Sequence, residues 1–350
     1  METKELLQIL SDAIGVSGYE DEVRDIIISL VAPLVDEVEV DTLGNLIVRK
    51  HGRTDKLLML DAHMDEIGLM INFIDDNGFL RFAKLGGWDD RILISHRVTI
   101  LTGERKRIIG VIGNLPPHIQ TEEDFRKVIK SEDLFIDIGA GNADEAKMMG
   151  VRVGDVAVIH YPFEEMTDNY VTGKAFDDRA CCAVIIKCLE SLKNIKTEVS
   201  IAAVFSVSEE KGMSGAKTSA FALNPDIALV LEGTIGADVP GVEPRKQPVA
   251  LGKGPAISIA DRLISIPRKI WEFIEKLANT QKIPYQFKMP TYSGTNAGAI
   301  HTSKTGILTG VISVPCRYIH SPVSTLRLDD FEWTVKLVTK FIKECHRLIH

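Results

Sequence analysis

Two adjacent glutamates, Glu209 and Glu210, come one residue after the strongly apolar segment VSIAAVFSV and are well placed for chemistry. Burying two neighbouring carboxylates costs several kcal/mol unless a cation lies beside them. A metal centre removes this cost, because one carboxylate can bind metal while the other stays free as a general base. The alternative is a solvated turn, which Lys211 would favour, but the buried segment before the pair favours the metal centre.

Two histidines and two further carboxylates stand in comparable places. His63 and Asp65 lie two residues apart in an extended segment, so both side chains point to one face. Asp65 could then hold the His63 imidazole in the orientation that a metal needs. An isolated H-x-D pair is more often a histidine satisfied by its neighbour. Glu232, in VLEGT, and His320, in RYIHSP, would add one carboxylate and one imidazole.

Asp177 and Asp178 precede an apolar helical segment at residues 179–193. Aspartate is a preferred N-cap, so one of the two is expected to have a local structural role. We give that role to Asp178 or its neighbour and the metal to Asp177, as a bridging carboxylate, although spacing alone leaves the choice open. Nitrogen and oxygen ligands without thiolate suit Zn, Co or Mn.

The elements that would position these residues are buried strands that alternate with helices. Four apolar segments, at 56–60, 199–207, 226–231 and 307–314, are each followed by one of the polar clusters. In open α/β sheets, ligands bind beyond the carboxyl ends of the strands. We therefore predict an α/β fold, an open twisted mixed sheet with helices on both faces, and one crevice in which the polar residues converge.

Residues 68–160 have a different, strand-rich pattern. GLMINFIDDNGFLRFAKL predicts a hairpin with Asn77-Gly78 at its turn, and HRVTILTGERKRIIGVIG predicts another. Helical periodicity occurs only around 121–131 and 142–149. We predict an inserted β-barrel-like domain at 68–160, and a discontinuous catalytic domain made of 1–67 and 161–350.

Composition narrows the class of protein. The 350 residues are 45% hydrophobic and 26% charged, which is ordinary for a globular protein, and the net charge of -8 argues against a nucleic-acid binder. The sequence has no run of about 20 apolar residues, so no membrane span is expected. Its charged, amphipathic start is unlike a signal peptide. Five cysteines without a CxxC pair favour buried thiols and a cytoplasmic location. These are Cys181, Cys182, Cys188, Cys316 and Cys345.

With these residues in place, the chain resembles the M42 family of metallo-aminopeptidases over essentially its whole length. The matching motifs are DAHMDEIG (61–68), GKAFDDRA (173–180), SVSEEKG (206–212), LEGT (231–234), SGTNAGAIH (293–301) and GVISVPCRYIHSP (310–322). The resemblance implies a zinc-exopeptidase-like fold and two divalent metal ions per subunit, zinc or cobalt. It implies that His63 and His320 bind separate metals, that Asp177 bridges them, and that Glu210 and Glu232 are terminal ligands.

The resemblance further implies that Glu209 is the general base and that Asp65 orients His63. The expected reaction is release of N-terminal amino acids from peptides with a free N-terminus. It also implies that the inserted domain is PDZ-like and serves oligomerisation, with dimers assembling into a dodecamer. Two alternatives stay open: a metallo-carboxypeptidase or deacylase with the same centre, and a non-catalytic assembly protein of the same fold.

Two departures from the family pattern stand out. The family often has aspartate where this chain has Glu232, which is one methylene longer. It frequently has Gly-Gly-Thr-Asp where residues 293–296 here are Ser-Gly-Thr-Asn. If that aspartate helps to anchor the substrate, Asn296 changes the anchor or the side-chain preference.

Overall fold

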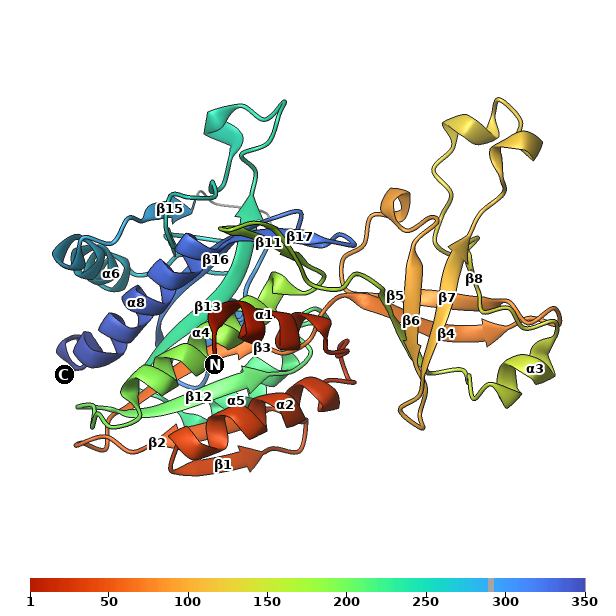
Figure 1. The fold of residues 1–350 in the computed structure, drawn as a ribbon. Coiled ribbons are helices and arrows are strands. Elements are labelled where there is room, and N and C mark those ends of the chain that lie inside the picture. Colours follow the sequence, from red (N-terminus) through yellow and green to blue (C-terminus); the bar gives the residue numbers. More distant parts are fainter. Residues whose placement is uncertain (289–292, 350) are drawn as a thin grey trace.

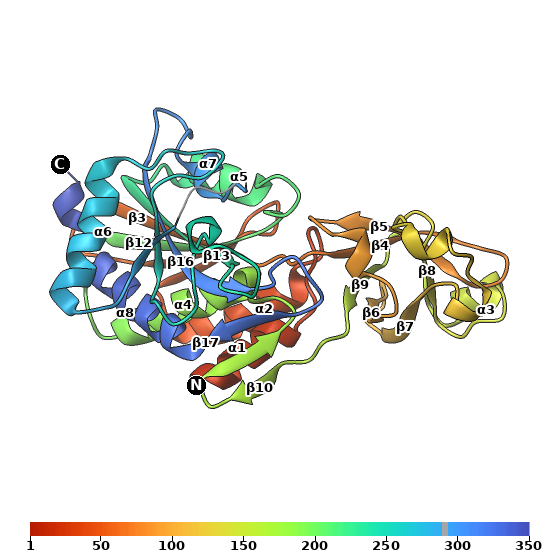
Figure 2. The same cartoon turned by 90° about the horizontal axis from the view of Figure 1, so that it is seen from above.

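A large mixed sheet and a separate closed barrel hold the strands of this protein (Figure 1). The structure is a computed structural model that describes residues 1–288 and 293–349, without the side chain of Phe125. The barrel stands beside the α/β body and is joined to it by two chain segments (Figures 1 and 2). The predicted fold class is therefore confirmed.

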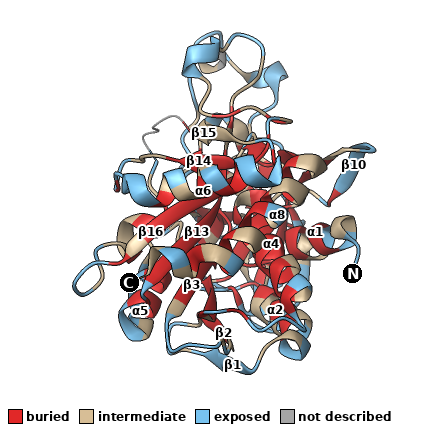
Figure 3. Ribbon diagram, turned by 90° about the vertical axis from the view of Figure 1, so that its left-hand side faces the viewer, coloured by how far each residue is buried: buried red, intermediate tan, exposed pale blue. Residues whose placement is uncertain are grey.

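The sheet runs in the order β1-β2-β12-β3-β13-β16-β17-β11-β10, with β14 pairing β16 and β15 pairing β14. Its strands are β1 (Glu37–Val40), β2 (Leu46–Lys50), β3 (Leu57–His63), β10 (Glu164–Thr167), β11 (Tyr170–Gly173), β12 (Ser200–Ser206), β13 (Ile227–Gly236), β14 (Ala256–Ser258), β15 (Gln286–Lys288), β16 (Leu308–Arg317) and β17 (Ser324–Arg327). The central strands β12, β3, β13 and β16 are parallel to their neighbours in that group. They are apolar and buried, as parallel strands covered on both faces require (Figure 3).

Helices cover both faces of the sheet, as predicted. Figure 2 shows α1, α2, α4 and α8 on one side and α5 and α7 on the other. The helices are α1 (Thr3–Asp12), α2 (Asp21–Val31), α3 (Ala143–Met148), α4 (Phe176–Leu192), α5 (Ser214–Leu223), α6 (Arg268–Gln281), α7 (Ala297–Ile300) and α8 (Leu328–Glu344). Helix α4 is buried along nearly its whole length, so it is the central support of the sheet.

The barrel closes in the order β4-β5-β8-β7-β6-β9. Its strands are β4 (Gly68–Ile74), β5 (Leu80–Leu85), β6 (Arg97–Leu101), β7 (Arg107–Gly113), β8 (Phe135–Asp137) and β9 (Val156–Ile159). Both predicted hairpins are present, because β4 pairs antiparallel with β5 and β6 with β7. The predicted helix at 121–131 is wrong: only a short 3-10 turn, Asp124–Arg126, forms there. The described side chains of this segment are largely exposed, so little tertiary packing stabilises a helix there.

The two strands that lead to the candidate site separate as they approach it. β13 pairs with β3 only as far as Val230, opposite Asp61, and then continues to Gly236. Glu232 therefore lies within β13, where the sequence placed it at the end of a strand. The separation leaves a gap beyond the pair, at the carboxyl end of β3, and the candidate site residues gather at this gap.

Candidate metal centre

His63, the last residue of β3, is held from behind and presents one ring nitrogen to the site. Its side chain is 1% exposed. Nδ1 lies 3.0 Å from the backbone oxygen of Asp65 and 3.3 Å from its Oδ1. Nε2 faces two carboxylates, at 3.5 Å from Asp177 Oδ1 and 3.3 Å from Glu232 Oε1. The contacts at Nδ1 orient the ring so that Nε2 is free for a ligand.

His320 occupies the mirrored position on the other side of Asp177. It lies in the turn between β16 and β17, and its Nδ1 is 3.0 Å from the backbone oxygen of Gly87. Its Nε2 is 3.5 Å from Asp177 Oδ2 and 3.4 Å from Glu210 Oε1. Gly87 follows β5 of the barrel, so the barrel segment of the chain contributes a contact to the site.

Asp177 offers one carboxylate oxygen to each imidazole. A tetrahedral zinc ion with ligand bonds of about 2.0–2.1 Å needs its ligand atoms about 3.3–3.4 Å apart. The four nitrogen–oxygen separations at His63 and His320, from 3.3 to 3.5 Å, match this value. They are too long for strong hydrogen bonds between charged groups. The spacing thus fits a divalent ion in each of two neighbouring positions.

Three buried atoms around the first position have no hydrogen-bond partner within the described residues. They are Nε2 of His63, Oδ1 of Asp177 and Oε2 of Glu232. Unsatisfied buried polar atoms cost about 1–3 kcal/mol each, and more when they are charged. A cation bound among them would remove that cost. These three atoms therefore suit a metal ion as ligands.

Electrostatics at the second position also favour a cation. Burial raises the pKa of Glu210 to about 7, although the charge of His320 lowers it. Burial also raises the pKa of Asp177, but the neighbouring imidazoles of His320 and His63 outweigh it and hold this pKa well below its ordinary value. Without a metal, the two imidazoles are therefore protonated, and their positive charges balance part of the negative charge of the carboxylates.

Asp178 has a different environment from Asp177. Its Oδ2 accepts the backbone N–H of His63 at 3.1 Å, and its Oδ1 accepts that of Gly233 at 2.8 Å. One oxygen also comes within reach of His63 and Glu232, so ligand distance alone would admit it. Because both its oxygens bond backbone of β3 and β13, Asp178 ties the two strands together at the site. Asp177 and Asp178 have non-helical backbone angles inside α4, so the regular part of the helix begins after them, while the carboxylate of Asp178 bonds the two strands.

The segment that carries Glu209 and Glu210 is fixed by carboxylates from two other parts of the chain. Asp65 accepts the N–H of Glu209 at 3.0 Å and that of Glu210 at 3.1 Å. Glu20 accepts the N–H of Ser208 at 3.0 Å, where the backbone has φ +55°. Asp65 thus touches both the His63 ring and the backbone of the two glutamates, which couples them through one side chain.

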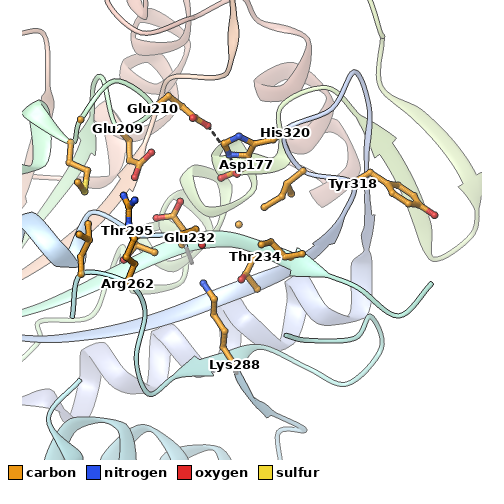
Figure 4. A pocket seen from close by; sticks show the side chains of 18 residues that line it. Asp177, Glu209, Glu210, Glu232, Thr234, Arg262, Lys288, Thr295, Tyr318 and His320 are labelled. Carbon is orange, nitrogen blue, oxygen red and sulfur yellow. Dashed lines mark ion pairs between the residues drawn. The ribbon is translucent and has the colours of Figure 1, made fainter. Parts of the chain in front are cut away.

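A cavity of about 570 Å³ opens over these residues (Figure 4). Asp177, Glu209, Glu210, Glu232 and His320 all line it. The carboxylate of Glu209 points into the cavity and has no ion pair within the described part of the chain (Figure 4). Burial, together with the charge of Glu232, raises the pKa of Glu209 well above its ordinary value. A carboxylate with a raised pKa at the edge of a cavity suits a general base.

Asn296, one of the two departures from the family pattern, does not face this cavity. It is buried, and its amide nitrogen donates to Asp61 Oδ1 at 2.7 Å and to Ser206 Oγ at 3.0 Å. An aspartate at 296 would place two buried carboxylates together, whereas the amide provides the donor that Asp61 needs. The asparagine therefore supports the base of the site, and it is not a wall of the pocket.

Comparison with known proteins places this geometry in a family. The model of the M42 glutamyl aminopeptidase family matches residues 44–337. The lysyl aminopeptidase of Pyrococcus furiosus is 33% identical over 343 residues, covering 97% of this chain and 96% of that protein. The chain belongs to the M42 glutamyl aminopeptidase family.

Two solved structures share the whole fold. Aminopeptidase APDkam598 from the archaeon Desulfurococcus kamchatkensis superposes with a TM-score of 0.94 at 40% identity, covering 98% of this chain and 94% of that chain. The TET1 peptidase of Pyrococcus horikoshii, described as assembling into a tetrahedron or a large octahedral shell, has a TM-score of 0.89 at 36% identity. It covers 98% of this chain and 100% of its own.

The helices and the cysteines also agree with what the sequence predicted. Among the described helices, none has the length and apolar character needed to cross a bilayer. All five cysteines are free and buried, as the absence of a CxxC pair indicated. Burial raises the pKa of the Cys181 and Cys182 thiols well above the ordinary value, so neither is a reactive thiolate.

Proposed function

We propose that this chain removes N-terminal amino acids from peptides at the cavity beside Asp177. One divalent ion would be held by His63, Asp177 and Glu232, and a second by His320, Asp177 and Glu210. The observation that carries the proposal is the placement of Asp177, whose two oxygens face the two imidazoles at 3.5 Å each. Family membership supports the same activity.

The residues of this chain divide the chemistry between them. When bound, the two ions supply an activated water and polarise the scissile carbonyl. Glu209 takes a proton from the water as its oxygen attacks the carbonyl carbon. When the carbon–nitrogen bond breaks, Glu209 passes that proton to the departing amine and is again a carboxylate. Asp65 acts as a positioning residue, because it holds both the His63 ring and the Glu209 backbone.

The ligand chemistry supports zinc or cobalt as the two ions. Two imidazole nitrogens and three carboxylates, with no thiolate, form a borderline-hard set that both ions accept. Glu232 reaches within 3.3 Å of His63 Nε2, so the additional methylene relative to aspartate still brings its oxygen to the site.

The substitution Glu209→Gln tests the proposal. The variant should keep its metal content, since Glu209 is not among the ligands, and its kcat on leucyl or glutamyl p-nitroanilide should fall by 10² or more. Glu132→Gln, at an exposed site of the barrel, is the matched control and should keep both properties. Substrates with an acetylated N-terminus separate the aminopeptidase from a deacylase. Full turnover by Glu209→Gln, or preference for the acetylated substrates, would overturn the proposal.

We also propose that residues 68–160 form a domain used for self-assembly, with dimers building a dodecamer, and that the protein is cytoplasmic. Many of the exposed large apolar side chains of the described residues belong to this segment. They include Phe73, Ile109, Leu115, Ile119 and Val153. Contiguous exposed apolar surface commonly marks interfaces, so an assembly would bury such side chains. The TET1 neighbour, described as able to assemble into a tetrahedron or a large octahedral shell, has the same fold throughout. Light scattering should give about twelve times the chain mass of 38.7 kDa, and a monomer mass would contradict the proposed assembly.

A further inference from the structure

Lys288, at the end of β15, is a buried cation that faces the cavity. Its residue is 2% exposed, yet it lines the cavity wall opposite Glu209 and Glu210. Figure 4 shows its ammonium group directed into the cavity, next to Thr234 and below Glu232. Its ammonium group makes no hydrogen bond and no ion pair with another described residue.

Burying an ammonium group in this position costs free energy unless an anionic group binds it. Burial lowers the pKa of Lys288, while the charges of Glu232, Asp261 and Asp177 raise it. Asp261 is engaged elsewhere: its Oδ1 accepts the N–H of Leu263 at 2.7 Å, and its Oδ2 accepts the Thr295 hydroxyl at 3.0 Å. Its carboxylate is therefore not free to pair with the lysine.

The site carboxylates are not free for Lys288 either. Asp177, Glu210 and Glu232 would each be shared with a divalent ion in the proposed centre. A ligand carboxylate that is shared with a divalent ion has little attraction left for a lysine. With both ions bound, these three carboxylates would be engaged by the metals, and Lys288 would stay available in the buried wall.

The surroundings of Lys288 offer hydrogen bonds as well as charge. Thr234 is buried, and its hydroxyl has no partner within the described residues. Arg262 provides a second cation at the more exposed rim of the same cavity (Figure 4). The wall therefore presents a buried ammonium group, a free hydroxyl and a guanidinium, and none of these suits an apolar or a cationic side chain.

We propose that Lys288, together with Thr234, binds the side-chain carboxylate of an acidic N-terminal residue and makes glutamate or aspartate the preferred substrate. This inference rests on the proposed function. The names of the relatives do not decide the matter, because the matching family model is described as glutamyl and a 33% identical relative as lysyl. The preference is inferred from the residues that line the cavity of this chain.

The test compares glutamyl with glutaminyl p-nitroanilide on the metal-loaded enzyme. The two side chains have the same shape, and neither leaving group carries a carboxylate, so the ratio of the two kcat/KM values isolates the side-chain charge. We expect a ratio of at least about tenfold, the value of one charged hydrogen bond. In Lys288→Met the ratio should fall to about one or lower. The matched control Lys253→Met, at an exposed turn, should leave the ratio as it is.

A binding measurement provides a second, independent readout. Calorimetric titration should show that free L-glutamate, the expected product, binds more tightly than L-glutamine, and that Lys288→Met removes this difference. Circular dichroism and metal content of the variant establish that it is folded and loaded.

Each outcome has one meaning. A glutamyl-to-glutaminyl ratio that Lys288→Met does not change, or a faster reaction with leucyl or lysyl substrates than with glutamyl, overturns this inference and leaves the aminopeptidase proposal standing. Failure to cleave any aminoacyl anilide after metal loading would overturn the proposed function itself.

Discussion

Replacing Gly87 with alanine should weaken one of the two proposed metal positions and spare the other. The carbonyl oxygen of Gly87 lies 3.0 Å from Nδ1 of His320 and orients that ring. A Cβ atom built on Gly87 would lie 2.9 Å from the same Nδ1 and 3.4 Å from Cε1. The contact at 2.9 Å is closer than carbon and nitrogen tolerate, so the imidazole must move away from its partner.

The expected size of the effect follows from this geometry. His320 belongs to a half-exposed turn and can shift, so the fold should survive while Nε2 leaves its place opposite Asp177. Loss of the partner that orients a metal-binding histidine typically costs 10- to 100-fold in metal affinity. This factor corresponds to about 1.4–2.7 kcal/mol. His63 and Glu232 lie on strands of the α/β sheet, so the position that they form with Asp177 should keep its affinity.

The assay is calorimetric titration of zinc into metal-free protein, with metal content after dialysis as a check. The unsubstituted chain should show two binding events, and Gly87→Ala one normal and one weakened event. Gly103→Ala is the matched control, because it lies in the same barrel with open space around a new Cβ. Two unchanged events in Gly87→Ala would refute the reasoning, and so would equal weakening of both in a protein that is otherwise folded.

Two further predictions concern the paired aspartates and the protons at the site. Asp177→Asn should lose at least one metal, whereas Asp178→Asn should keep both. The free energy of unfolding of Asp178→Asn, measured by urea denaturation, should fall by about 1–3 kcal/mol, because one backbone N–H of His63 or Gly233 loses its acceptor. The reverse pattern would make Asp178 the ligand. Burial lowers the pKa of His320, but Asp177 and Glu210 outweigh this and raise it to about 10. The metal-free ring is therefore protonated at pH 7, so zinc binding should release a proton to an indicator dye and weaken about tenfold per pH unit as pH falls; metal binding without proton release would contradict this.

The sequence allowed the fold and the convergence of the site to be predicted because both follow from local patterns. Four apolar segments with polar ends become parallel neighbours, and this alone brings His63 and Glu209 to one edge of the sheet. The Asn77-Gly78 turn fixed the first barrel hairpin in the same local way. By contrast, the short strands β10, β11, β14, β15 and β17 carry too few residues to show a period.

The walls and supports of the site could not be predicted, because they come from distant segments. Gly87 reaches His320 across 233 positions of the chain, and Asn296 reaches Asp61 across 235. Neither contact has a local pattern, since each depends on how the whole fold closes. Lys288 likewise has no local pattern that predicts its burial beside the cavity. The choice between Asp177 and Asp178 likewise needed the backbone partners of Asp178.

The central claim is that Asp177 bridges two metal ions. Anomalous diffraction at the zinc edge, on crystals of protein loaded with zinc, tests it most directly. We predict two peaks on either side of the Asp177 carboxylate, one beside His63 and Glu232 and the other beside His320 and Glu210. A single peak, or a pair of peaks bridged by Asp178 in place of Asp177, would contradict this account.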